Sequence, residues 1–150
     1  MGRRFSFVLT TEDVYRAVYH DDHARGFLHS HSYTGNALAC RAALAVLDIF
    51  EEDRVLARNR EKSAQLSRRC GKLAEHAGVR HFRNTGMIWA FDVESEDPAF
   101  ARKFYQGALA RGLLLRPLGN TVYFMPPYLI DEENMDFLVE GTGAILDSLL

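Results

Sequence analysis

From residue 79 to the end of the chain, the spacing of the apolar residues changes three times between the two-residue period of strands and the longer period of helices. Turn and capping residues separate the segments, such as Gly86 in one place and Asp97 followed by Pro98 in another. The expected strands are residues 79–83, 87–93, 113–115 and 121–125, and the expected helices follow Asp97 and Asp131. This order favours an α+β fold in which helices cover an antiparallel sheet.

Two helices of different character are expected before this region. Residues 37–50 are apolar on every side and follow Asn36, a suitable N-cap, so this helix is expected to be buried almost all round. The next helix opens at Asp53, ends at Gly78, and has apolar residues on one face and charged residues on the other. The change predicts a boundary near residue 53. The expected domains are residues 1–52 and 53–150.

The first 36 residues carry weaker signals. Residues 5–9 are apolar and β-prone, and hydroxyl and acidic residues after them favour a short helix through Tyr19. Residues 20–36 are polar and rich in histidine, so a long loop is expected there, and loops of that length are usually functional or disordered.

Composition excludes several classes of function. The chain has 150 residues, of which 18 are Lys or Arg and 20 are Asp or Glu, so its formal charge of -2 offers no excess of cations for a nucleic acid. No apolar run approaches the roughly 20 residues of a membrane helix, and no secretion signal is seen. Cys40 and Cys70 form no CxxC pair. A cytoplasmic protein with reduced thiols and no membrane or nucleic-acid partner is expected.

A loop rich in hydroxyl groups stands immediately before the expected helix at residue 37. Its hydroxyl-bearing residues are Ser30, Ser32, Tyr33 and Thr34. Free N–H groups and the positive end of the dipole at a helix N-terminus favour an anion, so a phosphate is one interpretation. The alternative is that Ser32, Thr34 and Asn36 only cap the helix and fill a tight turn.

The same loop is rich in histidine. The histidines are His20, His23, His29 and His31. No Cys, Asp or Glu completes a metal site with them at helical spacing, so no metal is expected. No activated Ser or Cys nucleophile accompanies them either, so no catalytic role is assigned.

Arg116 is the second candidate site. The guanidinium follows Leu113–Leu115 and precedes Pro117, and burying it there would be costly without an anionic partner. A carboxylate ligand would satisfy it through two hydrogen bonds. A structural salt bridge or a solvated strand end explains it equally well. Aromatic residues at 123–128 are consistent with an apolar pocket or with ordinary core packing.

Two of these stretches resemble a known enzyme family. Residues 29–40, with the alanine-rich helix after them, resemble the segment that follows the catalytic lysine in class III aminotransferases, which depend on pyridoxal 5'-phosphate. Residues 115–128 resemble the C-terminal motif of the diaminopelargonic acid synthase group within that family. The resemblance implies homodimers of fold type I. Residues 1–52 would then be a remnant of the large cofactor-binding α/β domain, and residues 53–150 the small C-terminal domain.

The resemblance also implies roles for individual residues. His31 and Ser32 match the loop that reaches the cofactor phosphate of the neighbouring subunit, and Ser30 lies against substrate there. Arg116 matches the arginine that binds the distal carboxylate of 8-amino-7-oxononanoate, which the group converts to 7,8-diaminononanoate in biotin biosynthesis, usually with S-adenosylmethionine as amino donor. Many relatives have Gly-Pro-Thr where this chain has Ser30, His31 and Ser32, so the donor side of the pocket is expected to differ.

The lysine that holds the cofactor in the family has no counterpart among these residues. Lys62, Lys72 and Lys103 lie in expected amphipathic helices and match no cofactor position. Amino transfer needs such an amine, so this polypeptide alone is expected to be inactive. Residues 5–50 would normally pack on the large domain and on the partner subunit, so their apolar faces are expected to be exposed, with self-association or disorder. Alternatives are another class III ω-aminotransferase, or a free-standing α+β module that binds a carboxylate.

Overall fold

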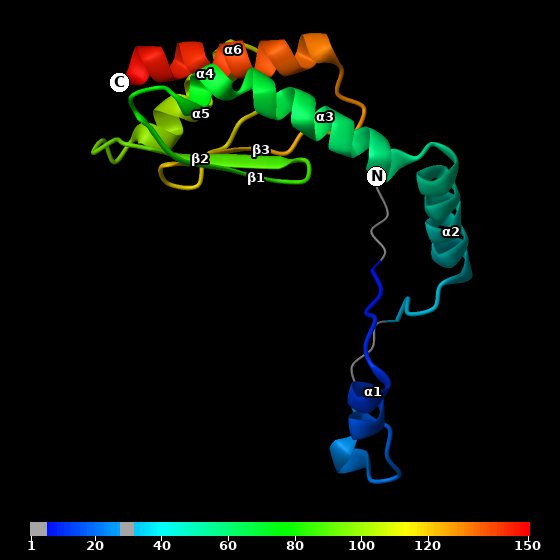
Figure 1. Cartoon of the computed structure of the whole chain (residues 1–150). Helices are drawn as coiled ribbons and strands as arrows, with labels where there is room; N and C mark the ends of the chain where they lie inside the picture. The colour runs from blue at the N-terminus through cyan, green and yellow to red at the C-terminus, as the bar shows by residue number, and fades with distance from the viewer. Residues whose placement is uncertain (1–5, 28–31) are drawn as a thin grey trace. The chain divides into compact units, whose positions relative to one another are not determined.

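The computed structural model describes residues 6–27 and 32–150 of the chain. The chain divides into two compact units, Met1–Asp53 and Arg54–Leu150 (Figure 1). Each unit is described by itself below. No helix in the described ranges is both long and apolar enough to cross a membrane.

The second unit is an antiparallel sheet covered by helices, which confirms the predicted α+β fold (Figure 1). Its strands run in the order β1-β2-β3 and both pairings are antiparallel. The strands are β1 (Val79–Thr85), β2 (Ile88–Val93) and β3 (Thr121–Phe124). The helices are α3 (Val55–Arg69), α4 (Gly71–Ala74), α5 (Phe100–Ala110) and α6 (Glu132–Leu149).

The β1–β2 hairpin forms because its turn and its side-chain alternation agree. Thr85 pairs with Ile88, which leaves a two-residue turn, and Gly86 takes the positive φ of 57° that the turn requires. Along β2, Trp89, Phe91 and Val93 point into the core while the residues between them point outward. The predicted hairpin is therefore confirmed.

Helices α5 and α6 close the core over one face of the sheet. The Asp131 side chain caps α6 by accepting a hydrogen bond from the Asn134 N–H, as predicted. Gly112, with φ 77°, follows the end of α5 as predicted. The helix begins at Phe100, two residues after Pro98, which was expected to be its first residue. The residues that α6 buries are Met135, Leu138, Thr142, Ile145 and Leu146.

Two expectations for this unit were wrong in detail. Asp53 follows the end of α2 and does not open the next helix. The N-cap of that next helix is Arg54, with φ 49°. The single helix expected there is divided at Cys70 into α3 and α4. Residues 113–115 are extended but form no strand, because the only backbone hydrogen bond they make within the described ranges runs from the Leu113 N–H to the Ala108 carbonyl, at 2.9 Å.

The first unit has the predicted helices but lacks the predicted burial. Its elements are α1 (Glu12–Val18), the 3-10 turn His23–Arg25 and α2 (Ala37–Glu52). Asn36 caps α2 as expected, since its side chain accepts a hydrogen bond from the Ala39 N–H at 2.9 Å. The described part of the expected strand at residues 5–9 forms no strand, because no partner strand stands beside it among the described residues.

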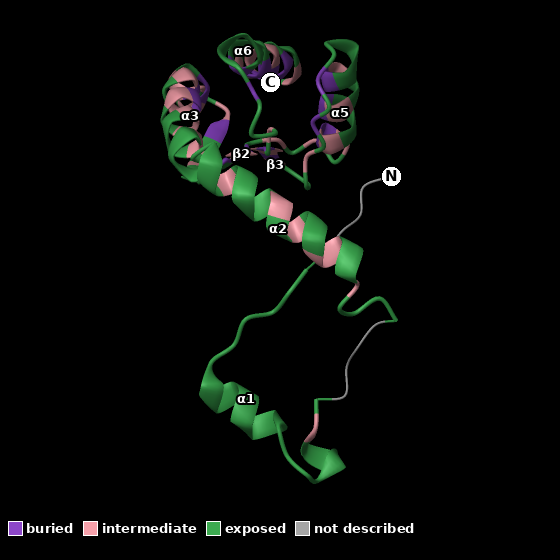
Figure 2. Ribbon diagram, turned by 90° about the vertical axis from the view of Figure 1, so that its right-hand side faces the viewer, coloured by how far each residue is buried: buried purple, intermediate pink, exposed green. Residues whose placement is uncertain are grey.

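Helix α2 contradicts its expected burial, because none of its residues is buried (Figure 2). Apolar composition alone cannot bury a helix without a second layer to pack against. The expectation that residues 5–50 expose their apolar faces is confirmed for the described residues, including Val8, Leu38 and Leu44. Self-association or disorder of this segment stays a prediction.

Candidate functional site

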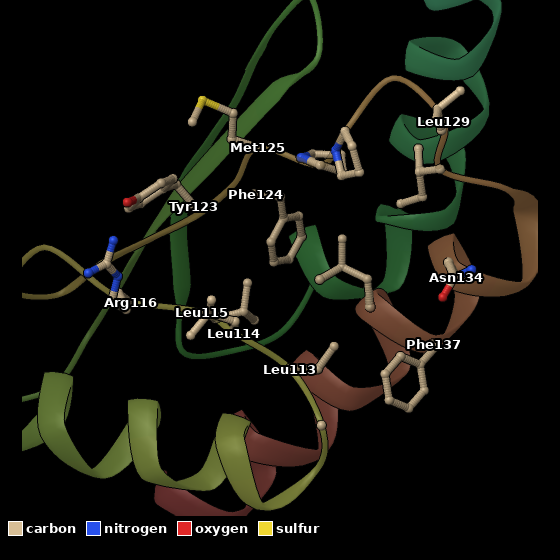
Figure 3. Close-up of a pocket in the computed structure, with 15 residues that line it drawn as sticks. Leu113, Leu114, Leu115, Arg116, Tyr123, Phe124, Met125, Leu129, Asn134 and Phe137 are labelled. Carbon is tan, nitrogen blue, oxygen red and sulfur yellow. The ribbon is translucent and has the colours of Figure 1, made fainter. Parts of the chain in front are cut away.

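A cleft of about 610 Å³ lies in the second unit, between residues 112–116 and the loop after β3 (Figure 3). Among the described residues, Arg116 is the only charged residue that lines it, and Tyr123 and Asn134 are the other polar side chains there. The rest of the lining is apolar or glycine. Its apolar members include Leu114, Phe124, Met125, Leu129 and Phe137. An apolar cleft with one cationic group suits a ligand that joins an apolar chain to an anionic end.

Arg116 is exposed and takes part in no ion pair or hydrogen bond within residues 6–27 and 32–150. Its predicted position at the end of a strand was wrong, because residues 113–117 stay outside the sheet. Of the two structural alternatives, the salt bridge is absent from the described ranges and the solvated guanidinium is present. A guanidinium offers five N–H donors in a planar arrangement, so the cation is available to a carboxylate.

The local sequence explains how Arg116 comes to face the cleft. Leu113 and Leu115 are buried in the core, so in an extended segment the side chains between and after them point outward. The same alternation in β3 buries Val122 and Phe124 and leaves Tyr123 half-buried. Figure 3 shows the Arg116 guanidinium beside the hydroxyl end of Tyr123.

The loop after β3 forms the far wall of the cleft and is tied to the helices. The Ile130 N–H donates to the Pro127 carbonyl at 3.0 Å, which closes a turn. Lys62 of α3 donates to the Tyr128 carbonyl at 2.6 Å. The wall is therefore positioned by contacts that do not use the ligand-facing side chains.

The second candidate, the hydroxyl-rich turn, lies in the first unit. Residues 32–35 form a turn in which Gly35 has φ 72° and the Asn36 N–H donates to the Tyr33 carbonyl at 3.1 Å. Ser32 is exposed at this turn, just before the N-terminus of α2. Ser30 and His31 lie outside the described residues. The capping interpretation is confirmed for Asn36, while Ser32 contributes an exposed hydroxyl whose chemistry suits the phosphate of a cofactor.

The three lysines are all in helices of the second unit. Lys62 is bonded to the Tyr128 carbonyl, and Lys103 forms an ion pair with Asp97 at 2.6 Å. Lys72 lies in the short helix α4 and is exposed. None of them lines the cleft that contains Arg116.

A polar cluster on the outer face of the sheet was not predicted from the sequence. Asp92 accepts hydrogen bonds from the Thr121 hydroxyl at 2.8 Å and from Arg83 at 3.3 Å, and its other oxygen lies 3.0 Å from His81 Nδ1. The Thr121 hydrogen bond, followed by those of His81 and Arg83, holds the pKa of Asp92 below its ordinary value. The outward position of Asp92 follows from strand alternation, but its partners depend on the register between strands.

Other reactive groups of the described chain are inert or dispersed. Burial raises the pKa of the Cys70 thiol to about 12, so it stays protonated and is a poor nucleophile. The described residues include no group of three or more His, Cys, Asp or Glu side chains placed to hold a metal ion. The cleft at Arg116 and the turn at Ser32 thus remain the two candidate sites.

Comparison with known proteins identifies the class to which this fold and cleft belong. The family model for class III aminotransferases matches residues 2–146, and the chain therefore belongs to the class III aminotransferase family. Enzymes of this family depend in general on pyridoxal phosphate.

Two similar curated relatives carry the name of the same enzyme of that family. The adenosylmethionine-8-amino-7-oxononanoate aminotransferase of Helicobacter pylori is 41% identical over 150 residues, covering 96% of this chain and 34% of the relative. The enzyme of the same name from Synechococcus elongatus is 34% identical, with the same coverage of 96% and 34%. The chain thus spans about a third of the length of the curated relatives that it matches.

Solved structures agree with the fold. The adenosylmethionine-8-amino-7-oxononanoate aminotransferase from Methanocaldococcus jannaschii superposes with a TM-score of 0.78 at 27% identity, covering 93% of this chain and 34% of that one. An (S)-enantioselective omega-transaminase from Thermomicrobium roseum gives a TM-score of 0.74 at 28% identity, covering 83% and 30%.

Proposed function

We propose that this chain is the C-terminal part of an aminotransferase that converts 8-amino-7-oxononanoate to 7,8-diaminononanoate, a step of biotin biosynthesis. The amino donor is S-adenosylmethionine, the cofactor is pyridoxal 5'-phosphate, and the complete enzyme works as a cytoplasmic homodimer. The names of the most similar relatives support this substrate. The observation that carries the proposal is the Arg116 guanidinium, which has no hydrogen-bond or ion-pair partner among the described residues, in a mostly apolar cleft.

The cleft matches the substrate in both parts. 8-Amino-7-oxononanoate has a carboxylate at one end, separated from its ketone by an unbranched apolar chain. Arg116 would bind the carboxylate through two parallel N–H donors, and Leu114 and Met125 would line the chain. Removing apolar surface from water favours such a chain by about 0.8 kcal/mol for each buried methylene group. Arg116 therefore orients the substrate and does not take part in bond making.

The first unit would serve the cofactor. The Ser32 hydroxyl, in front of α2, would donate a hydrogen bond to the cofactor phosphate. The family resemblance implies that His31 belongs to the same phosphate site and that Ser30 lies against substrate. When bound, pyridoxal phosphate supplies the electron-withdrawing ring on which an amino group can be transferred between donor and acceptor. We propose that none of Lys62, Lys72 and Lys103 holds the cofactor.

A hybrid enzyme tests the function. Residues of this chain replace the matching third of the Helicobacter pylori relative, which supplies the remainder of an aminotransferase. In this hybrid, Arg116→Ala is expected to raise the KM for 8-amino-7-oxononanoate by tenfold or more, because a charge-assisted bidentate contact is lost. The KM for S-adenosylmethionine should change by less than about twofold.

A matched variant controls for the loss of a positive charge. Arg102 is exposed on α5 and lies outside the cleft, so Arg102→Ala should leave both KM values unchanged. If Arg116→Ala raised both KM values equally, or neither, the assignment of Arg116 to the substrate carboxylate would be wrong.

A second candidate activity is that of another class III ω-transaminase, which is favoured by the omega-transaminase among the structural neighbours. The same hybrid separates the two. A hybrid that aminates 8-amino-7-oxononanoate poorly but accepts simple amines and keto acids would favour this alternative. A free-standing carboxylate-binding module would give a hybrid with neither activity.

A further inference from the structure

The segment before β3 begins as a β-hairpin and then leaves it. Leu118 and Thr121 exchange two backbone hydrogen bonds, of 2.9 and 3.0 Å, around a two-residue turn. Gly119 supplies the positive φ, 58°, at the first turn position, as two-residue hairpin turns commonly require. The bridge fixes the register, so that the next hydrogen-bonded pair outward would be Arg116 with Tyr123.

That next pair does not form. Within the described part of the chain, residues 114–117 make no backbone hydrogen bond with β3 or with any other backbone group. The outer edge of β3 is unpaired beyond the bridge, because β3 is the last strand of the sheet. The two arms diverge, and the cleft of about 610 Å³ lies between them.

The side chains of the two arms are nevertheless in phase for pairing. In the register set by the bridge, Leu115 faces Phe124, and both are buried. Leu114 faces Met125, and both are exposed, at 73% and 68%. A shift of one residue would place each pair on opposite faces of the sheet. The open segment therefore has the alternation of a strand in the correct register.

The segment is anchored at both ends, and between them only the Leu115 side chain is buried in the core among the described residues, with no backbone hydrogen bond. Leu113 is held by its hydrogen bond to the Ala108 carbonyl and packs closely against Gly141 of α6. Leu118 is held by the bridge to Thr121. Pro117 has no N–H, but in this register its nitrogen faces away from β3, where proline is tolerated. The missing N–H of Pro117 therefore does not prevent closure.

We propose that residues 114–117 form a strap that closes onto the free edge of β3, pairing Arg116 with Tyr123 and then Leu114 with Met125. Closure adds a short fourth strand to the sheet, narrows the cleft and fixes the Arg116 backbone beside Tyr123. Coupling of this closure to a bound carboxylate rests on the function proposed above. The closure itself does not.

Cysteine crosslinking of the 150-residue chain tests the strap. The first variant carries Leu114→Cys and Met125→Cys. In the closed register, the Cα atoms of these two residues would lie about 5.5 Å apart, within the range of roughly 4.4–6.8 Å that a disulfide needs. Leu114→Cys with Leu129→Cys is the matched control, since Leu129 is 90% exposed but lies out of register. Both variants also carry Cys40→Ser. Cys70 is kept, because it is buried.

In a glutathione redox buffer, the in-register pair is expected to crosslink at least tenfold faster than the control. In the crosslinked protein, the amide protons of Arg116 and Tyr123 should exchange at least tenfold more slowly than in the reduced protein, as seen by NMR. Equal crosslinking of the two pairs, no crosslinking of the first pair, or crosslinking without this amide protection would each overturn the strap.

Adding heptanoate to the crosslinking reaction tests closure of the strap and the proposed function separately. Heptanoate carries the carboxylate and the apolar chain of 8-amino-7-oxononanoate. It is expected to accelerate in-register crosslinking at least threefold, and to lose that effect in Arg116→Ala. In-register crosslinking that heptanoate does not change would support the strap and count against the carboxylate role of Arg116.

Discussion

Helices α2 and α6 differ in burial although their local signals are alike. They have 16 and 18 residues, and each begins with a side-chain cap, Asn36 or Asp131. Helix α6 buries five residues against the sheet and α5, whereas α2 buries none. Capping and propensity decide that a helix forms, but burial depends on whether another element covers it. Within the described residues, the first unit supplies no such element for α2.

The difference has an energetic consequence. Burying one large aliphatic or aromatic side chain contributes about 1.5–3 kcal/mol, and the second unit buries many of them around Trp89 and Phe91. The first unit has no buried residue at any described position. We expect it to open far more readily than the second unit.

The two cysteines should show the largest contrast between the units. Cys40 lies partly exposed in α2, whereas Cys70 is buried and its pKa is raised to about 12. At pH 8, only about one Cys70 thiol in ten thousand would be ionised, and the thiolate is the reactive form. Iodoacetamide should label Cys40 at least a thousandfold faster than Cys70, as measured by mass spectrometry of the Cys40→Ser and Cys70→Ser variants. Similar labelling rates would mean that the second unit opens as readily as the first.

The second-largest contrast between the units is expected in the stability cost of truncating an apolar side chain. Phe91 is fully buried, with its ring centroid 5.9 Å from that of Phe124, so Phe91→Ala should cost about 3–5 kcal/mol of unfolding free energy. Leu47 in α2 is half exposed, so Leu47→Ala should change the unfolding free energy by less than about 0.5 kcal/mol. Urea unfolding followed by Trp89 fluorescence measures the first change, and urea unfolding followed by far-ultraviolet circular dichroism, to which α2 contributes, measures the second. A cost for Leu47→Ala above about 2 kcal/mol would show that α2 has a buried face.

The smallest contrast is in acid sensitivity. The pKa of Asp92 is lower in the folded chain than its ordinary 3.8, so the unfolded chain binds this proton first as pH falls. The stabilisation is therefore complete well above pH 3.8 and is lost as pH falls through the folded pKa. Asp92→Asn should lower the urea midpoint at pH 7 and reduce its fall between pH 5 and pH 3.

Glu96→Gln provides the control for that measurement. Glu96 is exposed and makes no ion pair within the described ranges, so its substitution should leave the pH dependence of the second unit unchanged. An acid dependence of Asp92→Asn that equals the wild type would mean that the Asp92 cluster contributes nothing to folding.

Local signals in the sequence were sufficient for most of the second unit. The cap at Asp131, the turn at Gly86 and the apolar alternation of β2 act over a few residues, so they could be recognised without knowledge of the fold. Residues 113–115 show the limit of such signals. Their alternation is that of a strand, but whether they pair depends on how the chain on either side is anchored.

The candidate site was only partly accessible from the sequence for the same reason. Arg116 was found because a guanidinium in an apolar stretch is unusual, but its exposure depends on the path of the unpaired segment. The Asp92 cluster was missed because its hydrogen bond to Thr121 spans 29 residues and is set by the pairing of β2 with β3. Ser30 and His31 lie outside the described residues, and their roles stay predictions.

Amino transfer by the hybrid protein, compared with that by the 150-residue chain alone, tests most directly whether these residues are the substrate-binding part of an aminotransferase without its cofactor lysine. With pyridoxal phosphate and S-adenosylmethionine present, the hybrid is expected to convert 8-amino-7-oxononanoate, and the chain alone to show neither turnover nor the absorption band of a lysine-bound cofactor. Turnover by the chain alone, or a folded hybrid that binds cofactor but transfers no amino group, would contradict this assignment.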